Sequence, residues 1–276
     1  MTRIRCGTAA FFLFVGMSAP AVFAQFGPAA PSVMEASGVS HDAREAAGAV
    51  SGPASEAVLA PEMALQRFEQ RRHEESSLLA GYSDDMLMIA NLPDTRQNGE
   101  YELKRSYAAP DTLRFTPVRY TGDGFVKSNV LLRLLHAEAD HTLKKEGPRT
   151  AISQENYRFS YKSLEMLDGR AVYVFHAKPR KKRVGLFKGK VYLDASSGTL
   201  LRAEGTMVKS PSFFIRKLEF VQEYAQVNGF TLPTHLRSVA KVRIIGRTVV
   251  DVFHRDYQPQ RVASSHSAEV VPGANQ

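Results

Sequence analysis

The chain has 276 residues, of which 43% are hydrophobic, a formal net charge of +8 and a single cysteine, Cys6. A chain of this length can bury a hydrophobic core without covalent cross-links. Because its one cysteine lies at the extreme N-terminus, the sequence excludes a disulfide framework, a thiolate metal site and a cysteine nucleophile in the rest of the chain.

Residues 1–24 have the three parts of a secretory signal peptide. Arg3 and Arg5 supply the charged start, an apolar stretch runs from residue 9 to 23, and Val22-Phe23-Ala24 forms a small-residue cleavage site. Glycine, serine and proline interrupt the apolar stretch, which is shorter than the roughly 20 residues of a membrane span. We therefore expect cleavage after residue 24 and export to the periplasm.

Two segments rich in alanine, proline, serine and glycine flank the middle of the chain, at residues 25–57 and 258–276. Such segments cannot bury enough apolar surface to offset the entropy of ordering them. We predict a disordered leader, a disordered tail, and one folded domain at residues 58–257, which is a single domain by its length.

The first part of the domain predicts a helix followed by strands. The helix begins at Pro61, because proline suits a first helical turn, and ends at Gly81. A strand follows at residues 86–92. Asn98-Gly99 is predicted as a turn, after which residues 101–107 and 113–115 alternate between apolar and polar side chains, as strands do.

Residues 126–145 change to helical spacing, and their apolar side chains recur every three to four positions. Ser128 or Asp123 is the expected N-cap. The helix lies between two blocks of strands, so we expect it to cover them as a lid or a crossover.

From Tyr157 onward the alternation of strands resumes and continues to Tyr257. Tight turns are predicted at Asp168-Gly169, at residues 194–198 and at Asn228-Gly229. Strands of about ten residues joined by such turns are typical of an antiparallel meander that curls into a barrel or half-barrel.

Three segments resemble the periplasmic outer-membrane lipoprotein-sorting proteins, the LolA/LolB-like superfamily. They are the strand, turn and strand of residues 189–202, the turn and strand of residues 168–174, and residues 224–233. The resemblance covers about residues 60–257. It implies a mainly β fold with some α: an unclosed antiparallel β-barrel, or half-barrel, covered by a few helices. The cavity between them would take the acyl chains of a lipoprotein or phospholipid.

The resemblance also implies a lid contact, in which an arginine on an early strand holds the helices. Arg105 is the expected arginine, with Leu131, Leu134 and Leu135 as its partners on the helix. The side chains expected to line the lipid cavity share the apolar faces of their strands: Leu103, Phe115, Tyr157, Phe159, Tyr161, Phe214 and Phe220. The same faces would also fill a closed core, because a lined cavity and a packed interior need the same alternation.

A basic cluster at residues 178–183 contains Lys181, Lys182 and Arg183. We expect these three side chains to dock on anionic headgroups or on an acidic partner. The alternative explanation of the same charges is a solvated hairpin loop. Nucleic acid is not an expected partner of an exported protein.

The sequence carries no Gly-x-Ser-x-Gly motif, no glycine-rich phosphate loop and no His-Glu-x-x-His motif. His136, Asp140 and His141 offer too few aligned ligands for a metal, since two histidines five residues apart do not share one helix face. We therefore expect no cofactor and no metal.

Three functions follow from these observations. The first is a monomeric, non-enzymatic lipid or lipoprotein carrier that shields acyl chains, moves them toward the outer membrane and meets a membrane-associated donor or acceptor protein. The second is an interaction or sensor module with the same fold and a filled core. The third is a β-barrel enzyme whose residues assemble only in space.

Overall fold

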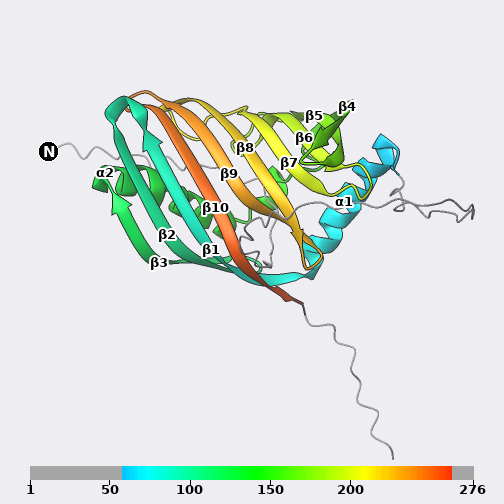
Figure 1. Ribbon diagram of the computed structural model, residues 1–276, viewed down its shortest axis with the longest axis horizontal. Coiled ribbons are helices and arrows are strands. Elements are labelled where there is room, and N and C mark those ends of the chain that lie inside the picture. The colour runs from blue at the N-terminus through cyan, green and yellow to red at the C-terminus, as the bar shows by residue number, and fades with distance from the viewer. Residues whose placement is uncertain (1–57, 263–276) are drawn as a thin grey trace, which may run out of the picture.

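The structure, a computed structural model, describes residues 58–262. The predicted signal peptide at residues 1–24 and leader at residues 25–57 lie outside this range, as does most of the predicted tail. The described chain forms one ten-stranded antiparallel sheet in the order β3-β2-β1-β10-β9-β8-β7-β6-β5-β4 (Figure 1). Because β3 and β4 end the sheet without pairing to each other, the barrel is unclosed, which confirms the predicted half-barrel.

The strands and helices have the following bounds. The strands are β1 (Leu79–Leu92), β2 (Gln97–Ala108), β3 (Thr112–Gly122), β4 (Tyr157–Leu167), β5 (Arg170–Pro179), β6 (Phe187–Asp194), β7 (Leu200–Met207), β8 (Ile215–Val227), β9 (Phe230–Val242) and β10 (Gly246–Arg261). The helices are α1 (Pro61–Leu78), α2 (Gly124–Val126), α3 (Leu132–Leu143) and α4 (Gly147–Thr150), with a 3-10 turn η1 (Pro93–Thr95) and a π turn η2 (Lys127–Leu131).

The helices cover one face of the sheet, because their apolar side chains join the strands in a single core. Phe68 of α1 and Leu131 and Leu135 of the α2–α3 segment belong to the same buried cluster as Leu103 of β2 and Phe220 of β8. A second, smaller buried cluster lies at one end of the sheet and contains Leu79, Tyr82, Phe230, Leu232 and Tyr257.

Two of the predicted hairpin turns are confirmed by their backbone conformation. Asp168 and Gly169 have φ angles of 48° and 79°, and Asn228 and Gly229 have φ angles of 50° and 83°. Positive φ at both central residues is what a two-residue hairpin turn requires, and asparagine, aspartate and glycine tolerate it best. The Asp194 carboxylate stabilises the third turn by accepting hydrogen bonds from the backbone of Ser196 and Ser197.

The predicted turn at Asn98-Gly99 is wrong. Both residues lie inside β2, paired with Asn91 and Ala90 of β1. The chain reverses earlier, where Pro93 begins a 3-10 turn and Arg96 adopts a left-handed conformation with φ of 55°. Gly99 instead leaves room for Tyr120 of β3, because a Cβ atom at residue 99 would lie 2.6 Å from the Tyr120 hydroxyl.

Both predicted helices are present, with different ends. The first stops at Leu78, and Gly81 lies within β1, where β2 approaches too closely for a side chain. The second begins at Gly124 after Asp123, whose carboxylate accepts a hydrogen bond from the Asn98 N–H rather than capping the helix. Ser128 lies within the π turn and caps nothing. At the other end of the domain, β10 continues past Tyr257 to Arg261.

Candidate functional site

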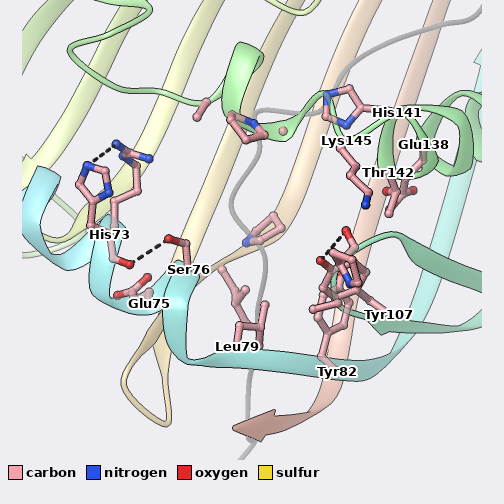
Figure 2. Close-up of a pocket in the computed structure, with 18 of the residues that line it drawn as sticks. His73, Glu75, Ser76, Leu79, Tyr82, Tyr107, Glu138, His141, Thr142 and Lys145 are labelled. Atoms are coloured by element: carbon pink, nitrogen blue, oxygen red, sulfur yellow. Dashed lines mark hydrogen bonds between the residues drawn. The ribbon is translucent and has the colours of Figure 1, made fainter. Parts of the chain in front are cut away.

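A cavity of about 650 Å³ lies at one end of the sheet, between the sheet and the helices (Figure 2). Ser76 and Glu75 of α1 border it on one side, and Glu138 and His141 of α3 border it on the other. Its apolar wall comes from the strands: Leu79, Tyr82, Tyr107, Leu232 and Tyr257. The cavity therefore combines an apolar surface with buried charged groups, among them Glu75 and Glu138.

Arg105 also borders the cavity, and it lies at the centre of a buried polar cluster. Its Nε donates to Asp84 Oδ1 at 2.7 Å, its Nη1 donates to Glu138 Oε1 at 2.8 Å, and its Nη2 donates to the Tyr257 hydroxyl at 2.9 Å. All four side chains are almost completely buried, and Arg105 is only 1% exposed. A buried charge is tolerated only when it is paired and hydrogen-bonded, and Arg105 meets both conditions.

The fold assembles this cluster from three parts of the chain. Asp84 and Arg105 face each other as direct partners across the β1–β2 pair. Tyr257 comes from β10, which pairs with β1 on its other side. Glu138 comes from α3, so its ion pair with Arg105 is a polar link between the covering helix and the sheet.

A fifth residue, His254 of β10, completes the cluster, with its Nδ1 2.9 Å from Asp84 Oδ2. Burial, reinforced by the nearby Arg105 charge, lowers the pKa of His254 to about 4, so the ring is neutral at pH 7 and donates its Nδ1 proton to Asp84. Although burial acts the other way, Arg105 and His254 hold the pKa of Asp84 below its usual value. Burial raises the pKa of Glu138 above its usual value, and Arg105 offsets only part of this.

Glu75 links the last turn of α1 to β9. The Glu75 carboxylate accepts hydrogen bonds from the Thr231 N–H at 2.9 Å and from the Thr231 hydroxyl at 3.1 Å. Burial raises the pKa of Glu75, and the two hydrogen bonds from Thr231 counteract the increase in part. This contact fixes the last turn of α1 beside the apolar wall.

The side chains predicted to line a lipid cavity divide into three groups. Leu103, Tyr157 and Phe220 are buried in the main core, and Phe115 and Phe159 are partly buried and pack against it. Tyr161 and Phe214 are 48% and 44% exposed, so they lie outside the apolar interior. None of the seven borders the 650 Å³ cavity, and their role in lipid binding stays a prediction.

Of the residues predicted for the lid contact, Arg105 lies on β2, Leu131 ends η2, and Leu134 and Leu135 lie on α3. Arg105 reaches α3 through Glu138, while Leu131 and Leu135 are buried in the core and Leu134 packs against it. The structure thus places the arginine, the leucines and the helix in one region. Whether the helix moves as a lid stays a prediction.

The basic cluster lies on the connection between β5 and β6. Lys181 and Lys182 are exposed, and Arg183 is partly buried, with its Nη1 3.4 Å from the Arg149 carbonyl oxygen. The predicted docking role of these three side chains stays a prediction.

The histidines considered for a metal separate in the structure. His136 is exposed, whereas His141 is buried with its Nε2 2.9 Å from the Thr150 hydroxyl. Among residues 58–262, no group of three or more histidine, cysteine, aspartate or glutamate side chains could hold a metal ion. Within the same residues, no helix is long and apolar enough to cross a membrane.

Sequence reasoning found Arg105 but missed Asp84, Glu138 and His254. A signal for Glu138 was present: it follows Leu131, Leu134 and Leu135 by seven, four and three positions, so it is an acidic residue on the apolar face of the helix. Asp84 and His254 gave no such signal, because their position depends on how β1, β2 and β10 align.

Comparison with known proteins gives a likeness in fold. No family model matches the chain, and no curated protein matches it. Among solved structures, a LolA superfamily protein from Nitrosomonas europaea is 12% identical, with a TM-score of 0.37, covering 74% of this chain and 96% of its own. An outer membrane lipoprotein-sorting protein domain from Vibrio parahaemolyticus is 14% identical, with a TM-score of 0.41, covering 74% and 95%.

The Pseudomonas aeruginosa MucA/MucB complex structure also matches, at 10% identity and a TM-score of 0.23, over 72% of this chain and 98% of that one. At these identities and TM-scores the likeness concerns general architecture, and the function proposed below is derived from the chain's own residues.

Proposed function

We propose that the chain is an exported, non-enzymatic binding protein that shields the acyl chain of a lipid or lipoprotein and helps carry it toward the outer membrane. The observation that carries this proposal is the 650 Å³ cavity between helices and sheet. Its volume lies within the range of roughly 300–1,000 Å³ that is usual for ligand pockets.

The lining of the cavity suits an amphipathic ligand. Leu79, Tyr82 and Leu232 offer an apolar wall on which methylene groups would be buried, at about 0.8 kcal/mol for each. Lys145, which pairs with Asp111, and Arg72, which pairs with Glu69, also line the cavity, and their positive charge would favour an anionic headgroup. We expect the acyl chain to lie along the sheet and the headgroup to lie beside these two basic side chains.

The attachment of α3 offers a way for the cavity to grow. The polar part of this attachment is the Glu138–Arg105 ion pair, and the apolar part is the packing of Leu131 and Leu135 on the core. If α3 moves away, the predicted cavity residues beneath it, Leu103 among them, become available to an acyl chain. The predicted lid contact then describes the interior with α3 packed on the sheet, and the predicted lipid cavity describes the same interior after α3 has moved away.

A second function remains supported by a specific observation: an interaction or sensor module with the same fold and a filled core. Leu103, Tyr157 and Phe220 are each at most 4% exposed, as expected of a packed interior. Under this alternative the protein would meet a partner through its surface, for which Lys181 and Lys182 are candidates, and would take up no lipid.

Native mass spectrometry of protein purified from periplasm without detergent, followed by lipid extraction, tests the first proposal. We expect acyl-chain species at near-stoichiometric occupancy. The protein should also bind a fluorescent long-chain fatty acid. A mass without bound lipid and no uptake of the fatty acid would favour the interaction module.

Two serines of α1 provide a matched pair of variants. Ser76 and Ser77 are both exposed, and each hydroxyl donates to the carbonyl three residues earlier, but only Ser76 borders the cavity. Ser76→Trp should fill part of the cavity and weaken fatty acid binding about tenfold, a change of about 1.4 kcal/mol. Ser77→Trp should bind as the unmodified protein does. Equal binding by both variants would place the ligand elsewhere.

A further inference from the structure

Four connections between strands lie at the same end of the sheet and adjoin one another. They are residues 93–96, 180–186, 208–214 and 243–245, which we call the loop rim. Three contacts join them: the Val208 N–H donates to the Leu186 carbonyl, the Arg243 N–H donates to the Phe214 carbonyl, and the Arg247 N–H donates to Asp94 Oδ2. Figure 1 shows the β1–β2 and β9–β10 hairpins side by side at this end.

The centre of the loop rim exposes three large apolar side chains. Phe213 is 77% exposed, Ile244 is 76% exposed and Phe214 is 44% exposed, and together they form what we call the apolar tip. Single exposed apolar residues are ordinary on a protein surface, but three on two adjoining connections form a patch that is typical of an interaction site.

The apolar tip is braced in this position by the backbone and by Arg243. The Arg243 Nε donates to the Phe213 carbonyl oxygen at 2.9 Å, and its guanidinium carbon lies 4.5 Å from the centre of the Phe213 ring. The two phenylalanine rings lie edge to face, with centroids 5.8 Å apart. Arg243 therefore stabilises Phe213 in an exposed position.

Positive charge surrounds the apolar tip. Lys209, Arg243 and Arg247 are exposed beside it, and Lys181 and Lys182 are exposed further along the same rim. In the described part of the chain, no ion pair engages any of these five side chains. The Asp94 carboxylate also lies in the loop rim, where it accepts a hydrogen bond from the Arg247 backbone N–H.

We infer that the loop rim docks on an anionic lipid bilayer, with the apolar tip in the interface and the basic side chains over the headgroups. Aromatic and aliphatic side chains flanked by lysine and arginine have the chemistry of interfacial membrane binding, in which apolar burial and attraction to anionic lipid act together. A second copy of the chain does not fit, because its rim carries the same charge. The inference holds whatever ligand the cavity takes.

Vesicle flotation of the full exported protein tests the inference. We expect binding to vesicles of phosphatidylcholine mixed with phosphatidylglycerol, weaker binding at high salt, and little binding to phosphatidylcholine alone, because charge attraction is screened by salt. The triple variant Phe213→Ser, Phe214→Ser, Ile244→Ser should lose at least about tenfold in affinity. The double variant Lys209→Glu, Arg247→Glu should lose the dependence on anionic lipid.

The matched control is Leu164→Ser with Met166→Ser, which removes two exposed apolar side chains from the edge strand β4. It should bind vesicles as the unmodified protein does. The triple variant should unfold at an unchanged temperature and should still take up the fluorescent fatty acid, so that loss of docking is distinguished from failure of the cavity proposal.

Three results would overturn the inference. The first is binding by the folded triple variant that equals that of the unmodified protein, and the second is no binding of the unmodified protein to anionic vesicles. The third is binding to isolated native membranes that protease treatment of those membranes abolishes, which would assign the loop rim to an acidic protein instead.

Discussion

Arg105 illustrates, at the scale of single residues, how a charge is kept inside an apolar sheet. Its guanidinium is held by two carboxylates and a tyrosine hydroxyl, and it lies 4.9 Å from the centre of the Tyr82 ring. Removing one partner leaves a buried charge without compensation, which costs far more than the pair itself contributes. The cluster is therefore a place where conservative changes are costly.

The variant Asp84→Asn should lower the free energy of unfolding by about 3–5 kcal/mol, because it leaves Arg105 underpaired in the interior. Asp85→Asn is the matched control, since Asp85 is the next residue of β1 and pairs with Lys104 across the same two strands, but in solvent. Exposed pairs contribute little. Urea unfolding of both variants measures the difference, and equal losses would contradict this account of the cluster.

The sequence could predict Arg105 because one charged residue among Tyr101, Leu103 and Tyr107 breaks an otherwise apolar strand face. Its partners were not predictable in the same way. Asp84 becomes a partner only when β1 and β2 align residue for residue, and a shift of one position would turn it to the other face. Glu138 was detectable from helical spacing alone and was overlooked.

At the scale of elements, α1 depends on a single buried polar contact at its C-terminal end. Glu75 accepts two hydrogen bonds from Thr231, and the helix also packs through Ala64 and Phe68. The cavity lies between this helix and α3, so the position of α1 determines how wide the cavity is.

Replacement of Glu75 by alanine should lower the free energy of unfolding by about 1–3 kcal/mol, because the buried Thr231 N–H loses its acceptor. It should also increase amide hydrogen exchange at the end of α1. Glu74→Ala, on the exposed side of the same turn, should change neither quantity. Exchange that rises equally in both variants would mean that Glu75 does not anchor the helix.

The elements that sequence reasoning located well are those whose physical signal is local. Asn228-Gly229 and Asp168-Gly169 turn because their residue types tolerate positive φ. Asn98-Gly99 has the same composition and does not turn, because the proline at residue 93 starts the reversal first. A local signal therefore predicts that a turn is possible, and neighbouring residues decide where it forms.

At the scale of the whole molecule, the buried cluster makes stability depend on pH. The pKa of His254 is depressed to about 4 in the fold and is about 6.5 in the unfolded chain. Between these values the unfolded chain binds a proton that the native protein does not, so stability falls as the pH falls from 6.5 to 4. The raised pKa of Glu138 acts in the opposite direction above pH 4.5.

The variant His254→Gln should remove the contribution of this histidine, so that stability falls less between pH 6.5 and 4, by up to a few kcal/mol over the interval. Glutamine can still donate to Asp84. His136→Gln, at an exposed position of α3, is the control and should leave the profile unchanged. Thermal unfolding across this pH range measures both, and identical slopes for all three proteins would contradict the assignment.

The architecture was predictable as a whole, whereas the residues that line the 650 Å³ cavity were not. Alternation and turn chemistry indicate an antiparallel meander, and the resemblance to the lipoprotein-sorting proteins indicates that it stays open; the ten-stranded sheet confirms both. The 650 Å³ cavity depends on where the helices α1, α3 and α4 lie on that sheet. The alternation of apolar and polar residues along a strand does not predict such long-range placement. For this reason the predicted apolar residues fall mainly in the core.

The strand order determines when the sheet can be completed during synthesis of the chain. The last strand, β10, lies between β1 and β9, so the first three strands join the other six only through it. A chain that emerges N-terminus first cannot complete its sheet until residue 261 is free, and β1 waits with one edge unpaired until then. Such sequence-distant pairing is slow to form. The sheet therefore lacks a strand between β1 and β9 until synthesis reaches the end of β10, and the pairings of β10 with these two strands form last.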